Sequence, residues 1–248
     1  MKLLIRRWLF RIYILHHRLM HRIGVLPFDR DFGDSRGTPV GRYYVEKFLR
    51  ENADQVRGRC LEFGDPRYKS YFPAAEKYEV VSIKPGPGVD YVCDIHDPKG
   101  LPEGEYDSIV CTQVFEHLAR PELAAQSLYR LLKPGGVLLL TAPFLNPVHG
   151  LPLDFRRFTP NALELILQDA GLVVDSIDFG GNSNVSLGSM LGMVQEDFTT
   201  KELEIKDPVY PYNCLIRAHR PTAEELVSER GSCRNTFMVL SSNTMEAS

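Results

Sequence analysis

Short apolar runs alternate with longer segments of helical periodicity through most of the chain. The apolar runs predict buried β-strands at residues 60–63, 80–83, 108–111, 137–141 and 173–177, and helices are predicted at 42–58, about 121–132 and 160–170. Continuous apolar strands that alternate with helices indicate a mostly parallel sheet with helices on both faces. The predicted fold class is therefore doubly wound α/β, in which ligands bind at the carboxyl ends of the strands.

The carboxyl-terminal third of the chain shows a less regular pattern. Thr159 before Pro160 is a favourable helix start and Gly171 a favourable stop. A last strand, expected to be antiparallel, is predicted at 236–241, after a helix that opens with the capping box Thr222 and Glu225. The residues between, about 180–234, are predicted as a long insertion. Its polar aromatic residues suit a substrate cover, and a packed structural elaboration is the alternative.

Residues 1–28 are predicted as a basic amphipathic helix that precedes a domain at 29–248. At about 100° per residue, one sector holds Ile5, Trp8, Leu9, Ile12, Leu15, Leu19 and Ile23, and another holds Arg7, Arg11, Arg18 and Arg22. A membrane span needs roughly 20 consecutive apolar residues, and the arginines prevent a run of that length. The segment also lacks the pattern of a signal peptide. Three interpretations stay open: the apolar face covers the domain or a second subunit, residues 1–23 lie on an anionic membrane surface, or the segment is a transit peptide.

The charges of the chain are unevenly placed, although the net charge is only −3. Six of its 29 Lys and Arg residues precede the first acid, Asp29, which leaves 23 against 32 Asp and Glu in the remainder. Phosphate contacts require clustered cations, so an acidic body argues against a nucleic-acid partner. The sequence leaves the oligomeric state open.

The cysteines and histidines show no metal-ligand spacing. The five cysteines are odd in number and form no CxxC pair: Cys60, Cys93, Cys111, Cys214 and Cys233. This pattern predicts neither a disulfide framework nor a metal site. A cytoplasmic setting is the expectation, with the amino-terminal segment placing the protein at a membrane face as an open alternative.

Three motifs in succession carry a family resemblance. They are "GRCLEFGDPRY" at 58–68, "YDSIVCTQVFEHL" at 106–118 followed by "LKPGG", and "PVHGLPLDFRRFTPNALELIL" at 147–167. Together they resemble the class I S-adenosylmethionine-dependent methyltransferases with a methyltransferase-11 type domain, over about residues 42–177. The resemblance implies a Rossmann-like fold, S-adenosylmethionine as cofactor and transfer of its methyl group.

The resemblance also implies cofactor-binding residues. Glu62 and Gly64 match the acid and first glycine that hold the methionine end of the cofactor. Asp94 matches the acid that meets the adenine amino group, and Ile95 beside it lines the base. The residues that follow the fourth strand, where the family closes over the sulfonium, are Gln113, Glu116 and His117.

Two positions depart from the family pattern. Asp65, Pro66 and Arg67 stand where further glycines would let the backbone approach the ligand. Lys84 (or Ser82) stands where an acid usually accepts from both ribose hydroxyls, and a lysine donates but cannot accept. Asp65 could meet the cofactor's amino group or ribose in compensation, so Asp65 and Lys84 are candidate cofactor-binding residues.

The loop after the fifth strand carries the candidate acceptor residues. His149 is a candidate general base, because an unperturbed imidazole titrates near neutrality. Arg156 and Arg157, with Asp154, are candidate substrate-binding residues, since paired guanidinium groups suit an anionic acceptor. The alternatives are a backbone hydrogen bond for His149 and a salt bridge between Asp154 and one arginine.

These expectations lead to two hypotheses of different classes. The first is an S-adenosylmethionine-dependent methyltransferase that acts on a small-molecule or glycan-like acceptor. The second is a catalytically silent interaction module with a methyltransferase-like fold. A nicotinamide dehydrogenase is excluded, because no G-x-G-x-x-G follows the first strand.

Overall fold

The computed structural model describes residues 12, 29, 33–150 and 153–227. Nearly all of the predicted amino-terminal helix, and the strand predicted at 236–241, lie outside these residues. The helix that opens with Thr222 begins within them, and both parts of its capping box are present: the Thr222 hydroxyl accepts from the Glu225 amide at 3.3 Å, and the Glu225 carboxylate accepts from the Thr222 amide at 2.7 Å.

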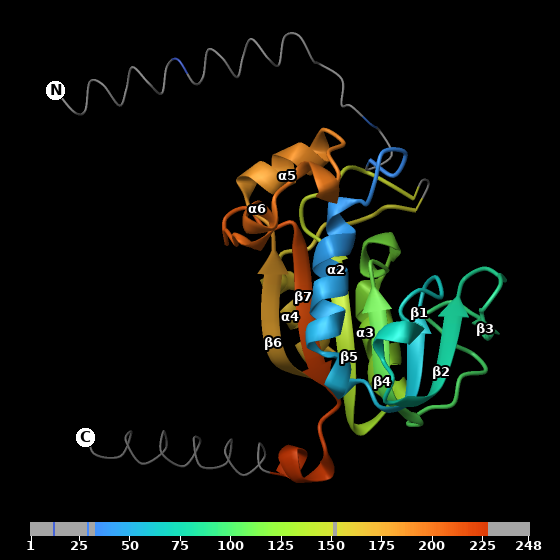
Figure 1. Cartoon of the computed structure of the whole chain (residues 1–248). Helices are drawn as coiled ribbons and strands as arrows, with labels where there is room; N and C mark the ends of the chain where they lie inside the picture. Colours follow the sequence, from blue (N-terminus) through green and yellow to red (C-terminus); the bar gives the residue numbers. More distant parts are fainter. Residues whose placement is uncertain (1–11, 13–28, 30–32, 151–152, 228–248) are drawn as a thin grey trace, which may run out of the picture.

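A seven-stranded sheet forms the centre of the fold (Figure 1). Its strands are β1 (Gly58–Phe63), β2 (Ala75–Ser82), β3 (Tyr91–Val92), β4 (Tyr106–Thr112), β5 (Leu132–Pro143), β6 (Val173–Gly180) and β7 (Asn213–His219), in the spatial order β3-β2-β1-β4-β5-β7-β6. Strands β1 to β5 pair in parallel, and β7 is antiparallel to both of its neighbours. The predicted fold class, a doubly wound and mostly parallel sheet with an antiparallel strand, is confirmed.

The central strands bury side chains on both faces of the sheet, as their continuous apolar runs predict. One face of β1, β4 and β5 joins α3 (Pro121–Leu131) and α4 (Pro160–Asp169) in the larger core, through Leu61, Ile109 and Leu138. A residue adjacent to each of these in the strand faces α2 (Val40–Glu51) in a second core: Cys60, Val110 and Leu139. This alternation places α2 on one side of the sheet and α3 and α4 on the other.

The segment between β6 and β7 is shorter than the insertion expected at about 180–234. It contains α5 (Ser183–Met190), the 3-10 turn η4 (Gln195–Asp197) and α6 (Thr200–Glu204), and β7 begins at Asn213. The antiparallel strand next to β5 is thus β7, which lies inside the range that the sequence analysis assigned to the insertion. The apolar run of β7 is short and follows a Tyr-Pro-Tyr stretch, so the pattern favoured the longer apolar run at 236–241.

The α5–α6 segment packs against the first helix of the domain. Tyr44 of α2 donates a hydrogen bond to the Leu203 carbonyl at 3.1 Å, and Val40, Tyr44, Val185, Leu203 and Tyr212 form a third apolar cluster. Asn182 caps α5 and donates to the carbonyls of Glu202 and Ile205 at 2.8 and 2.9 Å. Because β7 runs opposite to β5 and to β6, this segment lies at the edge where the parallel strands end (Figure 1).

Among the described residues, no helix is both long and apolar enough to span a membrane.

A buried carboxylate on β2 stabilises the edge of the sheet. The Glu79 side chain accepts hydrogen bonds from Arg59 at 2.6 Å, Lys77 at 2.7 Å and Tyr91 at 2.7 Å. Burial alone would raise the pKa of Glu79, but the three donors outweigh it and lower the pKa to about 2. We predict that Glu79→Gln lowers the free energy of unfolding at pH 7 by about 2 kcal/mol.

The contribution of Glu79 to stability should depend on pH, because folding lowers the pKa of its carboxyl group. The folded-state pKa is lower than that of the unfolded chain, so the carboxylate stabilises the fold above the unfolded pKa and ceases to do so as the pH falls toward about 2. The difference between wild type and Glu79→Gln in urea unfolding should shrink over that range. Glu76→Gln, at an exposed position of the same strand, is the control and should change stability little at any pH.

Candidate functional site at the carboxyl ends of the strands

The turn after β1 leaves open space at the end of the strand. Gly64 has φ 117, a conformation that disfavours any side chain, and its amide donates to the Val81 carbonyl at 2.9 Å. A Cβ built at Gly64 would meet only Val114, at 3.9 Å. No atom of Pro66, Arg67 or Lys84 therefore lies within 4 Å of that position.

The side chains that replace the expected glycines lie at the rim of this turn. Asp65, Pro66 and Arg67 are exposed, and Arg67 pairs with Asp65 at 3.5 Å. Lys84, two residues beyond the end of β2, is also exposed. These bulky residues consequently leave the immediate surroundings of Gly64 open.

Glu62 stabilises the turn after β1. Its side chain is buried and accepts from the Tyr78 hydroxyl at 2.8 Å and from the Arg67 amide at 3.3 Å. Burial raises the pKa of Glu62, and these hydrogen bonds oppose the rise without cancelling it. Glu62 thus contacts the backbone of the turn, which positions Gly64 and Asp65.

Asp94 and Ile95 follow β3 and face different surroundings. The Asp94 side chain is half exposed and accepts from the amide and the ring of His96 at 2.9 and 2.6 Å. Burial would raise the pKa of Asp94, but the hydrogen bonds from His96 are stronger in sum and lower it. Ile95 is buried in the larger core.

Gln113, which follows β4, has an unusual backbone conformation. Its φ is 53, the one positive value at a non-glycine position among the described residues. Its amide donates to the Thr141 carbonyl at 2.9 Å and its side chain to the Thr141 hydroxyl at 3.1 Å, so β5 holds it there. Strained backbone of this kind is most common at functional sites, and the sequence carried no signal for it.

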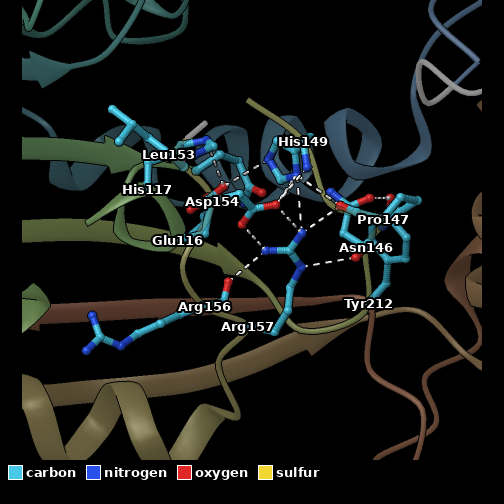
Figure 2. A network of polar contacts seen from close by, with 12 residues as sticks. Glu116, His117, Asn146, Pro147, His149, Leu153, Asp154, Arg156, Arg157 and Tyr212 are labelled. Atoms are coloured by element: carbon cyan, nitrogen blue, oxygen red, sulfur yellow. Dashed lines mark hydrogen bonds and ion pairs between the residues drawn. The ribbon is translucent and has the colours of Figure 1, made fainter. Parts of the chain in front are cut away.

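A polar network joins the 3-10 turn η3 (Phe115–His117) after β4 to the loop after β5 (Figure 2). Arg157 donates two hydrogen bonds to the Asp154 carboxylate, at 2.5 and 2.8 Å, and the Asp154 side chain is only 2 % exposed. Asp154 in turn accepts from the His149 amide at 2.7 Å. The Arg157 guanidinium lowers the pKa of Asp154 to about 2, although burial opposes this.

The two arginines of this loop bind backbone carbonyls. Arg157 donates to the carbonyls of Asn146, Pro147 and Arg156 at 3.0, 2.6 and 2.7 Å. Arg156 donates to those of Leu118 and Ala119, both at 2.8 Å. The salt bridge to Asp154, which the sequence analysis kept as an alternative, is present, and direct substrate binding by these residues stays a prediction.

The network surrounds one fully buried acid, Glu116. Its oxygen Oε1 lies 3.6 Å from His149 Nε2 and 3.9 Å from His117 Nε2 (Figure 2). The two imidazole rings pack edge to face, with their centroids 5.0 Å apart. The Glu116 carboxylate raises the pKa of His149, and burial of the ring opposes the rise. The structure thus brings His117 and His149 together with Glu116, whose place inside an apolar "VFEHL" stretch was the available sequence signal.

The α5–α6 segment reaches the same loop through Tyr212. The buried Tyr212 hydroxyl contacts Ser189 of α5 at 2.8 Å and donates to the Asn146 side chain at 3.2 Å. Asn146 and Tyr212 are site residues that sequence reasoning did not assign, because their contact joins positions far apart in the chain.

The chain matches a family described as "Methyltransferase domain" over residues 73–140. A 91-residue stretch is 32% identical to a ubiquinone biosynthesis O-methyltransferase of Pseudomonas paraeruginosa. That stretch is 30% of this chain and spans only 39% of the enzyme's length.

Solved structures with the same fold include proteins of different activity. The (4+2)-cyclase SpnF has a TM-score of 0.52 and 16% identity, over 86% of this chain and 96% of its own. An S-adenosylmethionine-dependent methyltransferase from Mesorhizobium loti has a TM-score of 0.51 and 13% identity, over 73% and 98% of the two chains. At such identities the likeness shows the fold alone.

The Asp154–Arg157 pair should be the main support of the loop after β5. Replacement of Arg157 by Met would leave the Asp154 carboxylate buried without its partner, and we predict a loss of about 3 kcal/mol in the free energy of unfolding. Arg67→Met breaks an exposed pair of the same kind at the same edge of the sheet and should cost less than about 1 kcal/mol. Equal losses in urea unfolding would contradict the assignment.

Proposed function

We propose that this chain, which matches the methyltransferase domain family over residues 73–140 and has the sheet order described above, is an S-adenosylmethionine-dependent methyltransferase acting on a small-molecule or glycan-like acceptor. The observation that carries the proposal is the turn at Gly64. Its open space and positive φ suit a bound nucleoside despite the three bulky residues that follow.

The residues at the strand ends fit the cofactor in part. Gly64 and Asp65 would hold the methionine end, and the ionised, half-exposed Asp94 is suited to accept from the adenine amino group. Gln113 and His117, which the family resemblance assigns to the cofactor, would flank the remaining side of the site. Lys84 fits the cofactor least well, because its ammonium group cannot accept hydrogen bonds from the ribose hydroxyls. Bound S-adenosylmethionine supplies a methyl group that its sulfonium already activates, so the chain contributes mainly positioning.

The acceptor would lie toward the polar network around Glu116. We place the acceptor's nucleophilic atom near His149, whose Nε2 faces Glu116 and whose raised pKa suits the removal of a proton near neutral pH. The name of the Pseudomonas relative, an O-methyltransferase, favours an oxygen nucleophile. Asp154, Arg156 and Arg157 then act by holding the loop that carries His149.

The second candidate is the catalytically silent interaction module. It is favoured by the Asp65-Pro66-Arg67 sequence at the turn and by Lys84 at the end of β2. The cyclase among the structural neighbours also shows that this fold does not by itself decide the activity. Cofactor binding separates the two candidates.

Calorimetric titration with S-adenosylhomocysteine tests the cofactor proposal. We expect the wild-type chain to bind and Lys84→Asp to bind about tenfold to a hundredfold more tightly, because the new carboxylate can accept from the ribose hydroxyls. Lys201→Asp, an equal charge change at an exposed position of α6, should bind like wild type.

Two results would contradict different parts of this proposal. A wild-type chain that releases no heat and shows no thermal shift at millimolar ligand would favour the silent module. Tight binding that Lys84→Asp leaves unchanged would mean that Lys84 does not face the ribose, while the cofactor itself remains.

The basic segment at residues 1–23 supports a further part of the proposal, contact with an anionic membrane surface. Its arginines and its single Trp8 have the pattern of interfacial helices. We predict that the full chain sediments with vesicles containing anionic phospholipid and that deletion of residues 1–28 abolishes this. Replacement of Arg7, Arg11, Arg18 and Arg22 by Gln should weaken sedimentation strongly, and a full chain that stays in the supernatant would refute membrane contact.

A further inference from the structure

Glu116 is a buried carboxyl group that faces two imidazole rings. Its side chain is fully buried, and neither carboxylate oxygen has a hydrogen-bond donor among the described residues. A buried polar group without a partner costs several kcal/mol of stability, and a carboxylate costs more than a neutral group. A bound ion is one of the explanations for a buried polar group of this kind.

Arg157, a partly buried arginine of the same network, does not supply the missing donor. Arg157 has five N–H donors, and all are committed: Nε to Asn146, Nη1 to Asp154 and Arg156, and Nη2 to Asp154 and Pro147. The groups that do face Glu116 are the two imidazole rings. One ligand atom from each of Glu116, His117 and His149 lies within 4.8 Å of the other two.

The backbone orients both rings as metal-binding histidines are commonly oriented. Nδ1 of His117 lies 2.6 Å from the Leu153 carbonyl, and Nδ1 of His149 lies 3.1 Å from the Pro147 carbonyl. A carbonyl only accepts, so the proton of a neutral ring sits on Nδ1 and the lone pair on Nε2. Both Nε2 atoms face Glu116 Oε1, at 3.9 and 3.6 Å. Such outer contacts fix the tautomer of metal ligands.

The site is held in place before any ligand arrives. The amides of Phe155 and Arg156 both donate to the Glu116 carbonyl, at 2.8 and 3.2 Å, which ties the loop to η3. Gly150 allows the loop to pass His117 closely, because a Cβ there would lie 2.7 Å from the ring. Fixed side chains lower the cost of gathering ligands around an ion.

We propose that Glu116, His117 and His149 bind a divalent transition-metal ion. Two imidazole nitrogens and one carboxylate suit Zn²⁺, Fe²⁺, Co²⁺ or Mn²⁺, whereas Mg²⁺ and Ca²⁺ prefer oxygen ligands alone. With bonds of about 2.0–2.2 Å, ligands of one ion lie at most about 4 Å apart, so the cluster needs only a small contraction. The cysteine and histidine spacing of the sequence had predicted no metal site.

Three protein ligands leave coordination positions open on the ion. An acceptor hydroxyl that binds there would have a lowered pKa and release its proton to solvent. His149 would then be a ligand rather than the base, and the acceptor would be a hydroxyl compound. This extension rests on the proposed methyl transfer, whereas metal binding itself does not.

The test uses the full chain, freed of metal with a chelator and titrated with Co²⁺ followed by visible absorption. We expect one equivalent to bind with the intense bands of a low-coordinate site, and Glu116→Gln and His149→Ala each to weaken binding by at least about a hundredfold. Circular dichroism checks that each variant is folded, and His117→Ala gives a third measurement if one is not. Calorimetry with Zn²⁺ repeats the titration without the spectral probe.

Two control variants remove histidines elsewhere. His219→Ala removes a partly buried ring that contacts Asp175 and Glu225, and the triple change His16→Ala, His17→Ala, His21→Ala removes those of the amino-terminal segment. Both controls should bind Co²⁺ like wild type. Loss of the signal in a control, or its persistence in Glu116→Gln and His149→Ala, would overturn the proposal, as would the absence of binding at millimolar Co²⁺.

Titration of the same samples with S-adenosylhomocysteine distinguishes the two proposals. A chain that binds the nucleoside but no Co²⁺ would overturn the metal site and leave the methyltransferase proposal standing. A chain that binds Co²⁺ but no nucleoside would overturn the methyltransferase proposal and leave the metal site standing.

Discussion

The bond between Arg157 and Asp154 is the interaction on which the candidate site depends. It buries a carboxylate against a guanidinium whose remaining donors bind three carbonyls of the same loop. The loop after β5 is thereby folded back over η3, and His149 comes to lie beside Glu116. Without this pair, the loop would have to satisfy the same polar groups with water, and the histidine would lose its fixed position.

The two halves of the site differ in their physical character. Around Gly64, Asp65 and Lys84 the surface is open and exposed, so a ligand there would be bound by rim side chains and backbone. Around Glu116 the site is more enclosed, because Glu116 is fully buried and the side chains of His149 and His117 are only 18% and 30% exposed. Polar groups there act more strongly on one another than at the exposed rim. This contrast suits a cofactor that enters from solvent and an acceptor atom that is held in a defined place.

The α5–α6 segment connects the site to the rest of the domain. It packs on α2 through Tyr44 and Leu203, and through Tyr212 it contacts Asn146 in the loop after β5. A displacement of this segment would therefore also move the loop that carries His149. Between the two uses that the sequence allowed for it, a substrate cover or a packed elaboration, the structure shows the packing, and the cover stays a prediction.

The sequence by itself determined five of the seven strands and the helices α2, α3 and α4, because apolar runs and helix-terminal residues act locally: 60–63 and 108–111 are strands, and Thr159 with Pro160 begins α4. It did not predict β3 or β7, and the short apolar run of β7 depends on two neighbouring strands for its pairing. Only the tertiary structure decided that Glu116, His117 and His149 face one another, and that Arg157 serves the loop. His149 lies 33 positions after Glu116 and 32 after His117, and the role of Arg157 depends on which carbonyls the folded loop presents. Local sequence pattern reports neither.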